Sequence, residues 1–92
     1  MYEFIWSSSF VKAYKKITKN NIIKKNRILD VLEIMSNDPF DPRLKTHKLH
    51  WILKNLQSSY IDYDTRLIFA IDKEINFNKI ILIDIGTHEE VY

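Results

Sequence analysis

A chain of 92 residues with a net charge of +2 is long enough for one domain, which we place over residues 1–92, because domains usually hold about 100 to 150 residues. Its residues are 46% hydrophobic and 28% charged, a balance that supplies a modest core and is not typical of a disordered chain. With no cysteine, one glycine and no apolar run near the roughly 20 residues of a membrane span, the sequence excludes thiol catalysis, cysteine-ligated metals and Gly-rich phosphate loops, and predicts a cytoplasmic protein with no cofactor and no membrane partner.

The first half of the chain predicts one strand followed by two helices. Residues 2–6 are aromatic and β-branched, which is typical of a short strand. The serines at 7–9 can cap a helix that starts near Phe10, and the Asn pair at 20–21 ends it. A second helix is expected from about 22 to 35. Because the connection is so short, we expect the two helices to form an antiparallel hairpin.

The first helix and the start of the second are strongly basic. Residues 12–27 contain seven basic residues and no acidic one: Lys12, Lys15, Lys16, Lys19, Lys24, Lys25 and Arg27. Such a block attracts a polyanion by neutralising phosphates and releasing their counterions. It can equally be the solvated face of a helix that keeps the protein in solution. Composition leaves both interpretations open.

The second half predicts strands. Prolines interrupt residues 36–43, residues 58–63 alternate in polarity, and two nearly continuous apolar runs at 66–71 and 80–85 are typical of strands covered on both faces. A polar hairpin loop is expected at 72–78, and the pattern between 44 and 56 fits a helix or a strand. The order β-α-α-β-β-β therefore predicts an α+β fold, with both helices packed on one face of an antiparallel sheet.

Three histidines are the first residues to suggest chemistry. His47, His50 and His88 in a chain without cysteine raise the question of a metal site. No third ligand stands at a recognised spacing from His47 and His50, so we predict no metal site. A partly exposed surface position is the plain alternative for any one of them.

Three stretches of the chain resemble a known family. They read Asp-Pro-Arg-Leu-Lys-Thr-His-Lys-Leu at 41–49, Ile-Asp-Tyr-Asp-Thr-Arg-Leu-Ile-Phe at 61–69, and Leu-Ile-Asp-Ile-Gly-Thr-His-Glu-Glu-Val-Tyr at 82–92. Their order and separation are similar to the RelE/ParE superfamily of type II toxins, above all its YafQ-type branch. The Gly-Thr-His sequence at 86–88 is the most specific part. The resemblance covers the whole chain and implies a RelE-like fold, mRNA endoribonuclease activity in the ribosomal A site, and a cognate antitoxin that holds the toxin inactive.

The resemblance also implies roles for single residues. His47 and His88 match acid–base histidines, Asp64 matches an aspartate of the catalytic face, and Arg66 matches the arginine that stabilises the transition state in YoeB-like members. The residues implied to be catalytic are His47, Asp64, Arg66, His88 and Tyr92. The residues expected to bind RNA are Lys45, Lys48, Lys54 and Tyr60, with Lys12, Lys15, Lys16 and Lys19 as an anchor for ribosomal RNA.

These residue types suit RNA cleavage without a metal ion. Attack by the 2′-OH needs a base, departure of the 5′-oxygen needs an acid, and the phosphorane between them needs a cation. Histidine suits the first two roles because its pKa of about 6.5 lets both protonation states exist near neutral pH. Arginine suits the third because its planar fork donates to two phosphate oxygens.

Structural alternatives stand beside these roles. Asp64 can close a tight turn with Thr65, and Arg66 can pair with Asp64 or Asp84 on the surface. Tyr92 can be an unstructured chain end.

Two other functions also stay open. Trp51 and Asn55 replace two glycines that relatives usually have, so the chain can be a decayed toxin that only binds its antitoxin. A ParE-like inhibitor of DNA gyrase is the other alternative, but a protein that only binds has no need of the histidine and arginine set.

Overall fold

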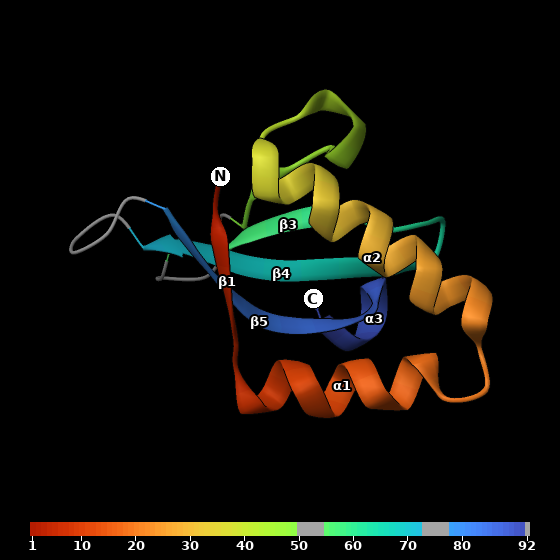
Figure 1. The fold of residues 1–92 in the computed structure, drawn as a ribbon. Coiled ribbons are helices and arrows are strands. Elements are labelled where there is room, and N and C mark those ends of the chain that lie inside the picture. The colour runs from red at the N-terminus through yellow and green to blue at the C-terminus, as the bar shows by residue number, and fades with distance from the viewer. Residues whose placement is uncertain (50–54, 73–77, 92) are drawn as a thin grey trace.

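A five-stranded sheet and two long helices form two layers in the computed structural model, which describes residues 1–49, 55–72 and 78–91 (Figure 1). The elements in chain order are β1 (Glu3–Trp6), α1 (Ser8–Thr18), α2 (Ile22–Asn37), the 3-10 turn η1 (Pro42–Leu44), β2 (His47–Lys48), β3 (Gln57–Tyr60), β4 (Thr65–Asp72), β5 (Lys79–Thr87) and α3 (His88–Val91). The expected α+β class is confirmed, with β2 and α3 added to the expected order. No helix in the described ranges has the length and apolar content to cross a membrane.

Side-chain caps define the ends of the helices where the sequence predicted them. The Ser7 hydroxyl accepts a hydrogen bond from the backbone N–H of Phe10 at 3.1 Å and begins α1. Asn20 has a φ of 55°, in the left-handed region that asparagine tolerates, and turns the chain toward α2. The Asn21 side chain then accepts from the N–H of Lys24 at 3.0 Å and caps α2. The connection between α1, which ends at Thr18, and α2, which begins at Ile22, is therefore short, as predicted.

Two predicted boundaries were wrong. Helix α2 continues to Asn37, because the interruption begins only at Asp38, whose backbone is extended before Pro39. Strand β3 ends at Tyr60 and not at residue 63. The Asp62 carboxylate accepts from the backbone N–H groups of Asp64 and Thr65 at 3.3 and 3.1 Å, which closes a turn where the alternating pattern suggested a strand.

Two other expectations fall partly on residues outside the described ranges. Between 44 and 56 the described residues form the end of η1 and the short strand β2, whereas 50–54 lie outside. The hairpin loop expected at 72–78 lies mostly in the range 73–77, which is also outside.

The sheet has the strand order β1-β5-β4-β3-β2 and is mixed. Neighbouring strands run antiparallel from β5 to β2, as expected, but β1 pairs with β5 in parallel, from Glu3 opposite Lys79 to Trp6 opposite Leu82. The expectation of a purely antiparallel sheet was wrong for this pair. A parallel pair requires a long crossover, and here both helices and three strands lie between its members.

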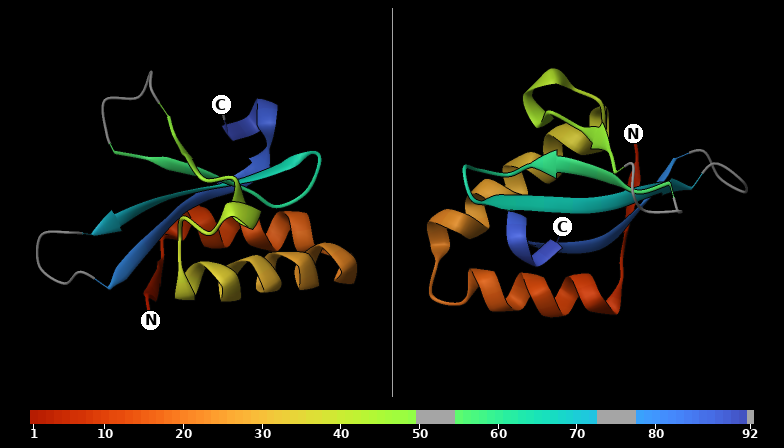
Figure 2. Two further views of the ribbon diagram at one scale, coloured as in Figure 1. Left: turned by 90° about the horizontal axis from the view of Figure 1, so that it is seen from above. Right: turned by 180° about the vertical axis from the view of Figure 1, so that it is seen from behind.

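Helices α1 and α2 cover one face of the sheet, and α3 lies on the other, as the view along the sheet shows (Figure 2). We call the second face the open face. The core between helices and sheet contains Phe10, Ile28, Val31, Leu32, Met35, Leu44, Ile61, Leu67, Phe69, Ile80, Leu82 and Ile85. An irregularity in the β4–β5 pairing places Phe69 opposite Leu82 although Ile68 lies opposite Asp84. The extra residue in β5 lets both Leu82 and Ile85 reach the core.

Removing a core side chain from β4 tests this packing. Leu67 is fully buried, so Leu67→Ala should lower the free energy of unfolding by about 3 kcal/mol, through lost burial and the cavity left behind. Urea denaturation followed by circular dichroism measures the change. The control is Ile23→Ala, because Ile23 is 81% exposed and its loss should cost less than about 0.5 kcal/mol. Equal losses in the two variants would contradict the assignment of the core.

Candidate functional site

The sheet register brings three predicted site residues onto the open face. His47 of β2 lies opposite Ser58 of β3, and Tyr60, two residues further along β3, lies opposite Arg66 of β4. Residues that are paired across strands point to the same face, and their neighbours along each strand point to the other. Since Leu67 is in the core, Arg66, Tyr60 and His47 lie on the open face.

The Tyr60 ring is flanked by two cations. The Lys45 Nζ lies 4.6 Å from the ring centroid, and the Arg66 guanidinium carbon lies 4.9 Å from it. Cations at this distance are attracted by the negative face of an aromatic ring. The structure therefore brings together a residue predicted to be catalytic and two predicted to bind RNA, and it concentrates positive charge at the Arg66 end of β4.

The Arg66 guanidinium is fixed by the turn that precedes it. Its Nη1 donates to the backbone carbonyl oxygens of Asp62 at 2.6 Å and Thr65 at 3.0 Å. Neither Asp64 nor Asp84 forms an ion pair with it in the described part of the chain, so the surface pair considered for Arg66 is not formed. On its other side β5 presents Gly86, which is paired opposite Arg66 and adds no side chain to the open face.

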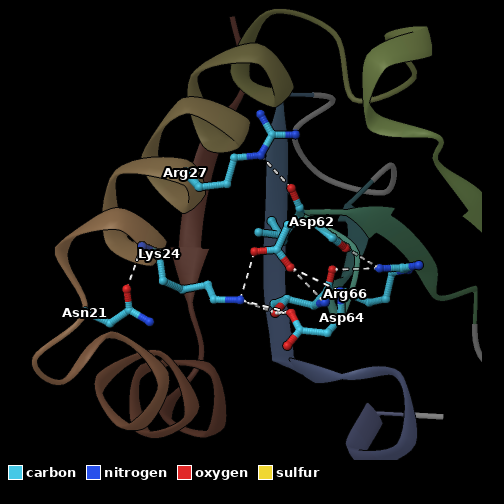
Figure 3. Close-up of polar contacts among 8 residues, drawn as sticks. Asn21, Lys24, Arg27, Asp62, Asp64 and Arg66 are labelled. Carbon is cyan, nitrogen blue, oxygen red and sulfur yellow. Dashed lines mark hydrogen bonds and ion pairs between the residues drawn. The ribbon is translucent and has the colours of Figure 1, made fainter.

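Asp64 belongs to an ion cluster on the helix side of the same turn (Figure 3). The Lys24 ammonium donates to Asp62 Oδ2 at 2.8 Å, to Asp64 Oδ1 at 3.0 Å and to Thr65 Oγ1 at 2.8 Å. We call these four residues the Lys24 cluster. The Thr65 hydroxyl also donates to Asp64 at 2.8 Å, so the turn that we considered for Asp64 and Thr65 is present. In the sequence Lys24 is only one member of the basic block at 12–27, and no local pattern there indicates this role.

Asp64 and Lys24 are both charged at neutral pH. Hydrogen bonding with Asp62, followed by the contacts with Lys24 and Thr65, lowers the pKa of Asp64 from 3.8 to about 2. Burial disfavours the charged form of Lys24, but its bonds to the two carboxylates outweigh this and raise its pKa above 10.5. A carboxyl group with so low a pKa carries no proton near pH 7, so it is unsuited to act as a general acid there.

The remaining candidates occupy three places. His47 and Lys48 are exposed on the edge strand β2, where the His47 Nδ1 lies 3.2 Å from the Lys45 carbonyl oxygen. His88 begins α3 directly after Thr87, which pairs with Thr65, so its backbone lies at the Arg66 end of the sheet. Lys54 and Tyr92 lie outside the described residues. The described ranges contain no group of three histidine, aspartate or glutamate side chains that could hold a metal ion.

The lysines of α1 lie on a different surface. Four lysines are exposed here, three in α1 and one directly after its end, and the opposite side of α1 packs against the sheet through Phe10: Lys12, Lys15, Lys16 and Lys19. Because α1 covers the helix face of the sheet, this basic surface and the open face lie on opposite sides of the molecule (Figure 2).

Comparison with known proteins gives one family and a set of similar structures. The model for the bacterial toxin YafQ of type II toxin–antitoxin systems matches residues 2–92. No curated protein matches. A metal-bound toxin from Helicobacter pylori has 27% sequence identity and a TM-score of 0.82, with 100% of both chains covered. YafQ from E. coli strain BL21(DE3) has 17% identity and a TM-score of 0.77 over 100% of this chain and 99% of that one. The E. coli DinJ–YafQ complex has 20% identity and a TM-score of 0.71, with 100% of this chain and 99% of that one covered.

The lowered pKa of Asp64 predicts how stability depends on pH. A carboxylate whose pKa is lower in the folded state stabilises the fold above its unfolded pKa, here 3.8, and this contribution is lost as the pH falls toward about 2. Asp64→Asn should therefore be less stable than the original protein at pH 7. The difference should shrink between pH 4 and pH 2. Urea denaturation at a series of pH values measures it.

The control for this series is Asp30→Asn, which changes an exposed carboxylate of α2 away from the turn. Its stability should follow that of the original protein at every pH. A difference between Asp64→Asn and the original protein that does not change from pH 7 to pH 2 would contradict the lowered pKa of Asp64.

Proposed function

Because the chain belongs to the YafQ family of bacterial type II toxins, we propose that it is an mRNA endoribonuclease that acts on the ribosome and uses no metal ion. The observation that carries this proposal is the Arg66 guanidinium, held beside Tyr60 on the open face near the start of α3. A protein that only binds DNA gyrase has no need of this arginine together with histidines at positions 47 and 88. The ParE-like alternative is therefore the weaker one.

The proposed reaction uses the 2′-OH of the substrate as the nucleophile. His47 takes the proton of the 2′-OH, and the oxygen of that hydroxyl group attacks the adjacent phosphorus. The bond from phosphorus to the 5′-oxygen breaks, and His88 gives that oxygen a proton. The products are a 2′,3′-cyclic phosphate and a 5′-hydroxyl end. Histidine suits both transfers, because neither protonation state is rare near neutral pH.

Arg66 is proposed to stabilise the phosphorane. Its Nη1 is engaged by two carbonyl oxygens, which fixes the plane of the guanidinium before substrate arrives. A fixed cation needs little reorganisation as negative charge develops on the phosphate, and this is the usual reason that such groups lower a barrier. Lys45, Lys48 and Lys54 would hold the neighbouring phosphates, and Tyr92 would contact a base or the reacting phosphate.

Tyr60 is proposed to support these cations instead of stacking on a base. Its ring already lies within 5 Å of Lys45 and Arg66, so a base would have to displace one of them. Asp64 is proposed to contribute through the turn before Arg66, since it is bound to Lys24 and stays ionised.

The basic surface of α1 is proposed to anchor the protein on its macromolecular partners. Contacts from lysines to phosphates position a protein on RNA without reading its sequence, which suits ribosomal RNA. An acidic segment of a cognate antitoxin can neutralise the same lysines. E. coli YafQ forms a complex with DinJ, and the present chain is similar to it over its whole length.

Cleavage on ribosomes tests the proposed function. We expect His88→Ala and Arg66→Ala each to reduce cleavage of ribosome-bound mRNA by about 10²–10⁴-fold, with binding to ribosomes near normal, because each group acts mainly in the transition state. A 2′-deoxy nucleotide at the scissile position should abolish cleavage. Mapping the product ends by primer extension and phosphatase treatment should show a cyclic or 3′-phosphate.

The controls separate the alternatives. The metal requirement is tested with toxin stripped of metal before it is added to intact ribosomes, because chelation in the reaction would disrupt them. Full cleavage of the deoxy substrate, or a 3′-hydroxyl product, would contradict the mechanism. No cleavage by the original chain, with tight binding to its cognate antitoxin, would identify a decayed toxin.

The α1 surface is tested by charge reversal. Changing Lys15, Lys16 and Lys19 together to Glu should slow association with the cognate antitoxin and flatten the dependence of that association rate on NaCl concentration, because fewer opposite charges are brought together. Stopped-flow measurements at several salt concentrations give both quantities. The same three lysines changed to Gln form the matched control, since Gln and Glu have similar helix propensity, and their effect should be intermediate. An unchanged salt dependence in the Glu variant would rule out this surface.

A further inference from the structure

The Lys24 ammonium uses its donors on a single turn. It binds Asp62, Asp64 and Thr65 at 2.8, 3.0 and 2.8 Å, and its side chain is only 16% exposed. An ammonium carries three N–H donors, so all are engaged in this arrangement. Lys24 comes from the first turns of α2, whereas its partners lie 38 to 41 residues later between β3 and β4. The contact therefore joins the helix layer to the turn.

The turn residues that bind Lys24 also bind Arg66 (Figure 3). Asp62 accepts from Lys24 through its carboxylate and from Arg66 Nη1 through its backbone carbonyl, at 2.6 Å. Thr65 accepts from Lys24 through its hydroxyl and from the same Nη1 through its carbonyl, at 3.0 Å. Two residues thus connect the ammonium on one side of the turn to the guanidinium on the other.

The turn is held weakly by its own backbone. The N–H groups of Ile61 and Asp62 donate to the Thr65 carbonyl at 3.1 and 3.4 Å, and the N–H of Thr65 donates to Asp62 at 3.3 Å. All three distances exceed the usual 2.9 to 3.0 Å for such bonds. The contacts from α2 are shorter, and Arg27 Nε adds one to the Ile61 carbonyl at 2.5 Å. The helix therefore does much to fix where the turn lies.

Loss of the ammonium would also leave two carboxylates facing each other. Asp62 and Asp64 both bind one nitrogen, so they lie close together, and like charges at such a distance repel unless a cation lies between them. The repulsion acts on Asp62, whose carbonyl is the shorter of the two anchors of Arg66. A change at Lys24 is thereby transmitted to the guanidinium.

We propose that Lys24 is a positioning residue for Arg66, which sets the place from which the guanidinium meets the scissile phosphate. This inference rests on the proposed function of Arg66 in RNA cleavage. Lys24 itself lies on the helix side of the turn and does not contact substrate. Its effect on the reaction passes entirely through the turn and Arg66.

A double-mutant cycle tests this dependence. Lys24→Met should lower kcat for ribosome-bound mRNA by about 10- to 100-fold and change KM by less than about threefold, because a small displacement of the guanidinium weakens only the transition state. In the Arg66→Ala background, the same Lys24→Met change should alter kcat by less than about twofold. A merely structural role would lower kcat equally in both backgrounds.

Two further variants guard against a general loss of stability. Val31→Ala destabilises α2 from within the core, away from the turn, and should keep its kcat at temperatures well below unfolding. Lys24→Gln retains an uncharged donor and replaces the Met variant if the latter does not fold. The inference would be overturned if Arg66→Ala lowers kcat while a folded Lys24→Met or Lys24→Gln variant does not. That result would leave the proposed function standing.

A readout that needs no activity completes the test. In ¹⁵N-labelled protein, two carbonyl acceptors on Nη1 should slow rotation of the Arg66 guanidinium and give separate Nη–H signals at low temperature. Lys24→Met should merge these signals. If the original chain cleaves no RNA, the proposed function fails, and this spectrum alone decides the positioning. Merged signals in the variant support it, and unchanged signals overturn it.

Discussion

Side-chain alternation along β4 is the constraint on which both the core and the candidate site depend. Leu67 and Phe69 point into the core beneath the helices. Arg66, which directly precedes Leu67 in β4, points to the open face. The same strand therefore supports packing and chemistry. Because the buried residues fix β4 in register, the backbone that carries Arg66 inherits the rigidity of the core, and a displaced register would move the guanidinium to the wrong face.

Local patterns were enough to predict most of the elements. The serine and asparagine caps, the helical spacing and the two apolar runs each act over a few residues, and each is found where the sequence placed it. Errors arose where a competing local contact or a distant partner decided the outcome. Asp62 closes a turn inside an alternating segment, and nothing in residues 2–6 indicates that their partner strand is parallel.

The individual residues of the candidate site were predictable from local sequence, but their contacts with distant partners were not. Arg66, Tyr60 and Lys45 were identified as single residues, but their contact follows from the pairing of β3 with β4 and from the η1 turn that precedes β2. Lys24 has no local signal, because it looks like any other member of a basic block until its two carboxylates arrive from about 40 residues away. The resemblance implies a catalytic role for Asp64, and this role stays a prediction; the contact of its carboxylate with Lys24 was not predicted.

The parallel pairing of β1 with β5 has a consequence for biosynthesis. Lys79, the partner of Glu3, is added to the growing chain 76 residues after it. Until then one side of β1 is without its strand, and the core lacks Ile80 and Leu82. Contacts between such distant residues form slowly, because a long loop must close first. The sheet therefore cannot close until the 76 residues after Glu3 have been added, and any activity that depends on the closed sheet has to wait for them.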